Sequence, residues 1–152
     1  MIGYEVMIKK TSSYARLKYL FGIWLDFSKM VGNVYSINDD YTIHVEEDFE
    51  RMHYKSATKW ILSASDENNH QQEDTVIQRM DRDKDTYNFI KYWAKNINGN
   101  YLDELERELI IRKWLLNQKY ECICRECYIS KSTYFKKIKE AERILILLWK
   151  LD

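Results

Sequence analysis

The chain contains no proline in 152 residues, and this feature limits its fold more than any other. Ordinary usage of about 5% would put roughly seven or eight prolines in a chain of this length. Proline breaks helix interiors, and glycine, which weakens them, occurs only four times. Long helices are therefore favoured, and we expect a mainly α-helical protein.

Apolar residues at helical spacing indicate where the first helices lie. Ser13 is placed to cap a helix that ends near Gly32. Residues 34–37 and 41–45 alternate in polarity on either side of Asn-Asp-Asp, which predicts a small hairpin. Helical spacing returns from Glu46 to Ser65, with acidic residues in the first turn, where the helix dipole favours them.

A polar segment divides the chain into two parts. Residues 66–74, DENNHQQED, include no apolar side chain, as is typical of a loop or linker. We therefore expect an N-terminal helical unit with its hairpin in residues 1–65 and a second helical domain in residues 75–152. Within the second domain, one helix or two short ones are predicted over 76–97, and a further helix is predicted over 102–115.

Positive charge is concentrated near the C-terminal end, although the whole chain is neutral, with 24 basic and 24 acidic residues. From Lys119 to Asp152 there are eight lysines and arginines against five aspartates and glutamates. Lys131 to Lys139 contain four lysines and no acidic residue. This segment is the best candidate for contact with a polyanion, although such a run is often only a solvated helix face.

The same region has the spacing of a helix-turn-helix motif, at about residues 120–140. A short helix over Tyr120–Cys127 would be followed by Ile129 as a buried residue in the turn and by Ser130 as the cap of the next helix. Three residues of that second helix recur at i, i+4 and i+7 and should face inward. They are Tyr134, Ile138 and Ala141.

Three cysteines lie in the predicted first helix. As small buried residues, Cys124 would sit where the helices cross and Cys127 would fill the core. The alternative is a zinc or iron–sulfur site that includes Cys122, with His44, His53 or His70 brought in from elsewhere. No second Cys or His pair follows at ligand spacing, so we expect no metal and no cofactor. A reactive thiol at Cys122 is a further alternative.

The stretch from about Leu102 to Leu148 resembles phage and bacterial late-transcription regulators of the ArpU/RinA type, which look like region 4 of sigma factors. The turn and recognition helix of that family read approximately I-S-x-x-T-Y-Y/F-x-x-K-x-x-A. The residues at those places are Ile129, Ser130, Thr133, Tyr134, Phe135, Lys139 or its neighbours, and Ala141. Many such motifs carry Gly where this chain has Tyr128.

The resemblance covers about a third of the chain. It implies sequence-specific binding to double-stranded DNA and activation of late phage or prophage genes in a bacterial host cell. The N-terminal part of a recognition helix reads base edges. The expected base contacts are Lys131, Ser132, Thr133 and Lys136. The expected phosphate contacts are Lys137, Lys139, Arg125 and Arg143. Tyr134 either donates to a phosphate or belongs to the core.

The segment Ile144–Trp149, ILILLW, is apolar on all sides and needs cover from two surfaces. One cover is the helix over 102–116, and the other is either the N-terminal unit or a second subunit. We expect a homodimer, because paired half-sites raise specificity. RNA polymerase is a further expected partner. Two alternatives remain: a DNA-packaging subunit like a small terminase, and a protein adaptor or anti-repressor that does not bind DNA.

Neither catalysis nor membrane insertion is predicted. The chain has no phosphate-binding glycine loop and no nucleophile elbow, so we do not expect an enzyme. No apolar run reaches the roughly 18 residues of a membrane span, and no signal segment is recognisable. A cytoplasmic protein is expected.

Overall fold

The chain folds mainly into α-helices, as its lack of proline predicts. The computed structural model describes residues 2–32, 34–49 and 69–152, with side chains in 12–32, 34–49 and 81–152. The elements in chain order are α1 (Ile2–Val31), β1 (Tyr35–Ile37), β2 (Ile43–Val45), α3 (Asn69–Asn98), α4 (Glu104–Ile110), the π-helical turn η2 (Ile111–Leu115), α5 (Tyr120–Cys127) and α6 (Lys131–Leu148).

Helix α1 is longer than its sequence pattern predicts. It begins at Ile2, so the prediction that Ser13 caps its N-terminus is wrong, and Ser13 is a buried residue inside the helix. No proline interrupts the residues before Ser13, so the helix can continue through them. Its end is as predicted: Gly32 follows Val31 with a φ of +76°, a backbone conformation in which glycine is favoured.

The predicted hairpin is confirmed. Strands β1 and β2 pair antiparallel, with Tyr35 opposite Val45. The backbone amide of Glu46 then donates to the carbonyl of Val34 at 2.8 Å, which continues the hairpin pairing. Residues 46–48 are not helical but Phe49 is, so the predicted start at Glu46 is wrong by three residues. Most of the predicted helix, residues 50–65, lies outside the described residues.

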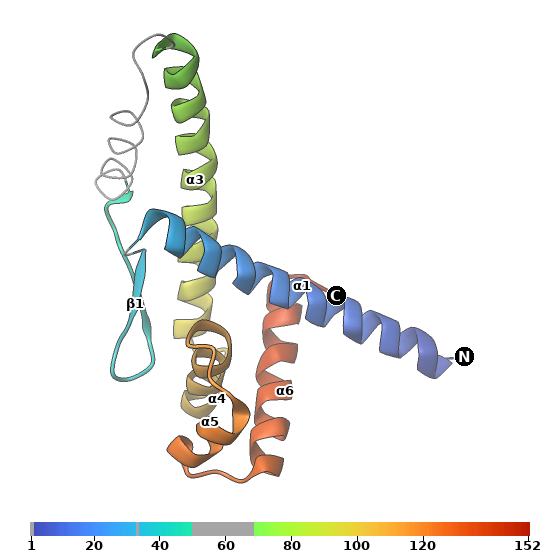
Figure 1. Cartoon of the computed structure of the whole chain (residues 1–152). Coiled ribbons are helices and arrows are strands. Elements are labelled where there is room, and N and C mark those ends of the chain that lie inside the picture. The colour runs from blue at the N-terminus through green and yellow to red at the C-terminus, as the bar shows by residue number, and fades with distance from the viewer. Residues whose placement is uncertain (1, 33, 50–68) are drawn as a thin grey trace.

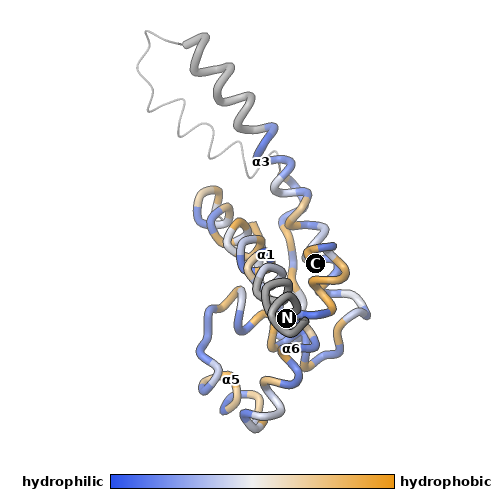
Figure 2. The backbone as a smooth tube through the Cα atoms, turned by 90° about the vertical axis from the view of Figure 1, so that its right-hand side faces the viewer, coloured by the Kyte–Doolittle hydropathy of each residue, from blue (hydrophilic) through white to orange (hydrophobic). Residues whose placement is uncertain are grey.

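Helix α3 begins within the segment predicted as a linker. Asn69 to Asp74 are helical, so this part of the linker prediction is wrong, while residues 66–68 lie outside the described residues. The segment is rich in glutamine and glutamate, which form helices readily, and contains no glycine or proline. From residue 81 onward, where its side chains are described, the first described turn of α3 is mainly hydrophilic (Figure 2).

The elements on both sides of residues 66–74 share one apolar core. Helix α1 lies across α3 and α6 (Figure 1). At the first crossing Trp24 stacks on Trp93 of α3, with ring centroids 6.3 Å apart. Near the second, Phe21 contacts Trp149, with centroids 6.0 Å apart, and stacks on Trp114 of η2 at 5.1 Å and 14°. Aromatic side chains therefore join the N-terminal helix to the C-terminal elements.

These contacts show what covers the apolar segment at the end of α6. Leu145 is fully buried, and Trp149 lies against Phe21. The guanidinium of Arg16 also donates to the carbonyl of Leu151 at 2.8 Å. Helix α1 of the same chain thus supplies a cover in addition to α4, while Leu147 stays 52% exposed. In the described part of the chain no helix is both long and apolar enough to cross a membrane.

The predicted helix over 102–115 is present, but it changes form along its length. Asp103 caps α4 and accepts a hydrogen bond from the Glu106 amide at 2.7 Å, while the Glu106 carboxylate accepts one from the Asp103 amide at 3.0 Å. After Ile110 the helix widens into η2, where the Leu116 amide donates to the carbonyl of Ile111, five residues back, at 2.9 Å. The widened turn places Trp114 and Leu115 in the core.

Candidate nucleic-acid interface

Helices α5 and α6 form the predicted helix-turn-helix. Helix α5 spans Tyr120–Cys127 and α6 begins after Ser130, as predicted, but α6 continues to Leu148, beyond the predicted end of the motif at about residue 140. Helix α5 ends at Tyr128, which has φ 56° and ψ 43°, a left-handed conformation that favours glycine. The tight turn is thus kept without glycine. The next amide, that of Ile129, donates to the carbonyl of Cys124 at 3.1 Å. The Tyr128 side chain is 96% exposed, so its ring does not compensate for the strained backbone.

The predicted cap of α6 is confirmed. The hydroxyl of Ser130 accepts a hydrogen bond from the Thr133 amide at 3.2 Å, and Ser130 itself has extended backbone angles, as N-cap residues do. The hydroxyl of Ser130 also donates to that of Thr133 at 2.9 Å. Thr133 is therefore engaged with the cap and only partly exposed.

The inward face of α6 is the predicted one. Tyr134, Ile138 and Ala141 are all buried. Tyr134 is only 3% exposed and lies against Tyr120 of α5, with ring centroids 6.2 Å apart. Burial raises the pKa of the Tyr134 hydroxyl. Of the two roles considered for Tyr134, this position fits the core and not a phosphate contact.

The outward face of α6 carries most of the residues predicted to meet DNA. Lys131, Ser132, Lys136, Lys139 and Arg143 are exposed on α6, as is Arg125 on α5. Among the described residues, neither Lys136 nor Lys139 takes part in an ion pair. Lys131 to Lys139 also contain no acidic residue, so the N-terminal half of this face is basic.

Two of the predicted phosphate contacts are paired within the chain. Lys137 is only partly exposed, and its ammonium contacts the Asp103 carboxylate at 2.8 Å. This hydrogen bond and the charge of Asp103 raise the pKa of Lys137. On the next turns of α6, Arg143 donates to Glu140 at 3.1 and 2.5 Å. Both basic groups would have to exchange a carboxylate for a phosphate before they could contact DNA.

One exposed residue of this face was not among the contacts expected from the sequence. Phe135 is 40% exposed and lies one helical turn after Lys131. The sequence does contain a signal for this position. Phe135 falls beside the inward series at Tyr134 and Ile138 but is not part of it, so its ring is directed partly outward.

A buried carboxylate holds α6 against the preceding helix. Glu142 is 7% exposed and accepts hydrogen bonds from the Lys113 ammonium at 2.9 Å and from the Trp114 indole N–H at 3.1 Å. Burial disfavours the charged form of Lys113, but the hydrogen bond and the charge of Glu142 outweigh this and raise the pKa of Lys113. These contacts define how α6 is rotated about its axis, and so which residues face outward.

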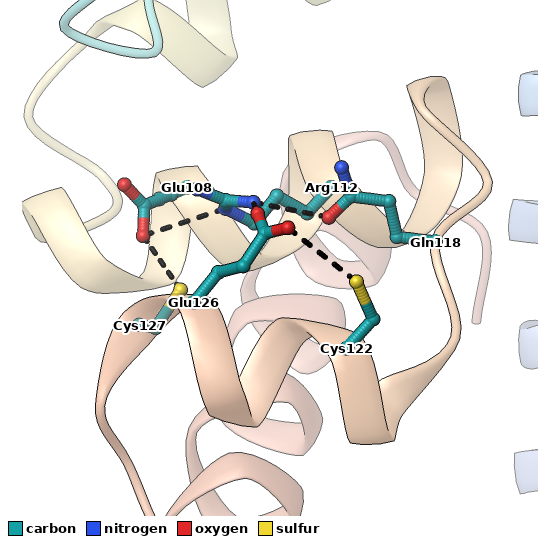
Figure 3. Close-up of polar contacts among 6 residues, drawn as sticks. All are labelled: Glu108, Arg112, Gln118, Cys122, Glu126 and Cys127. Carbon is teal, nitrogen blue, oxygen red and sulfur yellow. Dashed lines mark hydrogen bonds and ion pairs between the residues drawn. The ribbon is translucent and has the colours of Figure 1, made fainter.

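The arginine at the start of η2 fixes α5 in a similar way (Figure 3). Arg112 is 8% exposed and forms a very short ion pair with Glu126 of α5. It also contacts Glu108 at 3.6 Å and donates to Gln118 at 3.1 Å. The guanidinium carbon of Arg112 lies 4.8 Å from the centroid of the Tyr41 ring, a cation–π contact. A buried arginine paired in this way fixes the first helix of the motif.

The three thiols have separate partners and do not converge. Cys122 contacts Glu126 at 3.5 Å, and Cys127 donates to Glu108 at 2.8 Å (Figure 3). Cys124 lies 3.9 Å from the carbonyl oxygen of Ser130, at the helix crossing where it was predicted. Cys127 is only partly buried, so it fills the core less completely than predicted. The described residues include no cluster of histidine, cysteine and carboxylate side chains suited to a metal ion.

Comparisons of this chain with protein-family models, with curated proteins and with solved structures found no match.

Proposed function

We propose that this chain binds double-stranded DNA through α5 and α6 and regulates transcription, as an activator of late phage or prophage genes. The observation that carries the proposal is the capped helix α6, whose exposed N-terminal half bears lysines without any acidic residue. The cap and the buried series at Tyr134, Ile138 and Ala141 direct this basic face outward. A rigid helix of this kind is the part of a helix-turn-helix that enters the major groove.

The exposed residues divide into two kinds of contact. Lys131 and Ser132 lie in the first turn, where they would meet base edges, and Lys136 lies one turn further along the helix. Lys139 and Arg125 would meet phosphates. The N-terminus of α6 adds the positive end of the helix dipole, which favours a nearby phosphate. The paired residues Lys137 and Arg143 would contribute less.

The activator role requires further surfaces of the same chain. RNA polymerase is the proposed protein partner, in the cytoplasm of a bacterial host. If the chain forms a homodimer through Ile144–Trp149, Leu147 is its best contact residue, since Leu147 is 52% exposed while Leu145 is fully buried. Sedimentation velocity would separate a dimer from a monomer and from the ring expected of a packaging subunit.

The first test is fluorescence anisotropy of a labelled duplex pool, titrated with this protein across a salt series. If about four to six phosphates are engaged, the logarithm of affinity should fall against the logarithm of salt with a slope of roughly −4 to −5. The test variant is Lys136→Glu/Lys139→Glu, which reverses two unpaired lysines of the outward face and should bind weakly at every salt concentration.

The matched control is Lys91→Glu/Lys95→Glu, which makes the same change of charge at two exposed lysines of α3. It should lose much less affinity, because α3 lies away from the proposed interface. Equal losses in the two variants would indicate attraction by overall charge without a defined site. No binding by the folded wild-type protein at low salt would overturn the proposal and favour the adaptor or anti-repressor role.

A further inference from the structure

Phe135 is an apolar side chain on the outward face of α6, whose N-terminal half is otherwise polar. It lies between Lys131, one turn before it, and Lys139, one turn after it, and is 40% exposed. Partial burial of this kind leaves one part of the ring to pack against the protein and another part open to a ligand. Within the first two turns of α6, the other exposed residues are Lys131, Ser132 and Lys136.

The ring of Phe135 is held in place by two tyrosines. Its centroid lies 5.3 Å from that of Tyr120, on α5, and 5.1 Å from that of the buried Tyr134. Contacts with both helices of the motif restrict the motion of the ring. A side chain that is already restrained loses little conformational entropy when it contacts a ligand.

The ammonium of Lys131 is held beside this ring. It lies 5.5 Å from the centroid of Tyr120 and 6.0 Å from that of Phe135, both within the range of cation–π attraction. A hydrogen-bond donor and an apolar surface are therefore presented side by side at the N-terminal end of α6. This pair of groups has a specific chemical complement among the DNA bases.

We infer that Lys131 and Phe135 together recognise a thymine in the major groove, an inference that rests on the proposed DNA binding. Thymine presents the O4 acceptor and the C5-methyl group there, side by side. Lys131 would donate to O4 while the Phe135 ring packs on the methyl group. A ring-to-methyl contact of roughly 4 Å and a hydrogen bond of about 2.9 Å fit the spacing between the ammonium and the ring.

The same pair would discriminate against the other bases. Cytosine presents the N4 amino donor toward the lysine and has no methyl group. Adenine and guanine also lack the methyl group, so the exposed part of the Phe135 ring would remain without an apolar contact. The inference thus assigns specificity to two named side chains and one base type.

Two thymine analogues separate the roles of the two residues. A duplex is first selected from a random pool by binding to the full chain, and each of its thymines is then replaced in turn. Deoxyuracil keeps O4 and lacks the methyl group. 5-Methylcytosine, paired with guanine, keeps the methyl group and replaces O4 by an amino group. Affinities are measured by anisotropy at one fixed salt concentration.

For the wild-type protein we expect one thymine at which deoxyuracil weakens binding about fourfold, the effect of one buried methyl group. 5-Methylcytosine at the same position should weaken binding at least as much. In Phe135→Ala, thymine and deoxyuracil should bind equally while 5-methylcytosine is still rejected. In Lys131→Ala, the preference for thymine over 5-methylcytosine should fall while the methyl effect remains.

The matched control is Phe89→Ala, which makes the same substitution at a phenylalanine that is 58% exposed on α3, the helix that also carries the control positions Lys91 and Lys95. It should keep the wild-type response to both analogues. The analogue series on the unmodified protein needs no variant, so it tests the inference even if Phe135→Ala does not fold.

Failure of the inference can be told from failure of the proposed function. If a duplex is selected and bound but deoxyuracil is neutral at every thymine, or if Phe135→Ala keeps the methyl effect, the thymine pair is overturned and DNA binding stands. If no duplex is enriched and no salt-dependent binding is found, both are overturned.

Discussion

The carboxylate of Glu142 and the indole of Trp114 form a hydrogen bond of 3.1 Å that joins α6 to η2 in the core. Lys113 donates to the same carboxylate oxygen at 2.9 Å. Because both donors come from consecutive residues of one turn, they hold Glu142 from two directions. The outward face of α6 depends on this contact, since a rotation of the helix would bury lysines and expose Ile138 or Leu145.

Replacing Glu142 by alanine should lower the free energy of unfolding by about 2 kcal/mol. Removal of one partner from a buried ion pair costs about 3–5 kcal/mol, and we expect less here because the Lys113 side chain retains 25% exposure. Urea unfolding followed by circular dichroism measures the change. Glu140→Ala is the control, because its solvent-exposed pairing with Arg143 should contribute little to stability. Equal effects of the two substitutions would contradict the structural role of Glu142.

Tyr128→Gly should stabilise the protein by roughly 1 kcal/mol. The left-handed backbone of Tyr128, with φ 56°, costs a non-glycine residue about 1–2 kcal/mol, and glycine avoids this cost but loses more conformational entropy on folding. The side chain is 96% exposed, so few contacts are lost. Tyr128→Ala removes the same ring without relieving the backbone and should bring no gain. If Tyr128→Ala unfolded at a higher urea concentration than Tyr128→Gly, backbone strain at Tyr128 would be refuted as the explanation.

The local features of the motif could be predicted from the sequence. The boundaries of α5, the start of α6, the Ser130 cap and the inward series at Tyr134, Ile138 and Ala141 all follow from neighbouring residues. Capping and helical periodicity act over a few positions, so a single sequence contains the information. The left-handed turn at Tyr128 does not follow from its residue type, because glycine is the residue that usually marks this conformation.

Features that depend on distant residues could not be predicted. Lys137 is paired with Asp103, 34 positions away, and no local pattern distinguishes it from the unpaired Lys136. The start of α3 at Asn69 was missed because residues 69–74 contain no apolar side chain, and apolar spacing was the signal used. The extension of α1 before Ser13 was missed because a plausible cap residue lies inside the helix.

The thiol of Cys127 should resist alkylation. Burial, followed by the hydrogen bond to Glu108 and its negative charge, raises the pKa of Cys127 from 9.0 to about 12. The reactive thiolate is therefore about a thousandfold rarer at pH 8 than for a thiol of unshifted pKa. In a Cys122→Ser/Cys124→Ser variant, where Cys127 is the remaining cysteine, we expect the rate of reaction with iodoacetamide to rise about tenfold per pH unit up to about pH 11.

Mass spectrometry over a time course measures this rate. Adding Glu108→Gln removes the carboxylate charge and should lower the pKa of Cys127, so alkylation at pH 8 becomes faster. The urea-unfolded chain serves as the reference for an exposed thiol. A rate that reaches a plateau near pH 9 in the folded protein would show that Glu108 and burial do not protect the thiol.

Asp103→Asn should strengthen DNA binding, because Asp103 now neutralises Lys137 at 2.8 Å. Asparagine caps helices as well as aspartate does and can still accept the hydrogen bond from the Glu106 amide, so α4 should remain intact. Lys137 would then be free to meet a phosphate, and the salt slope should steepen by about 0.9 for one additional contact.

The control is Asp85→Asn, which makes the same change of charge at an exposed position of α3. If both variants gain affinity equally, the gain reflects overall charge, and the Lys137–Asp103 pair does not limit DNA binding. A steeper slope in Asp103→Asn alone would place Lys137 at the phosphate backbone and explain why this lysine lies on α6 despite its internal partner.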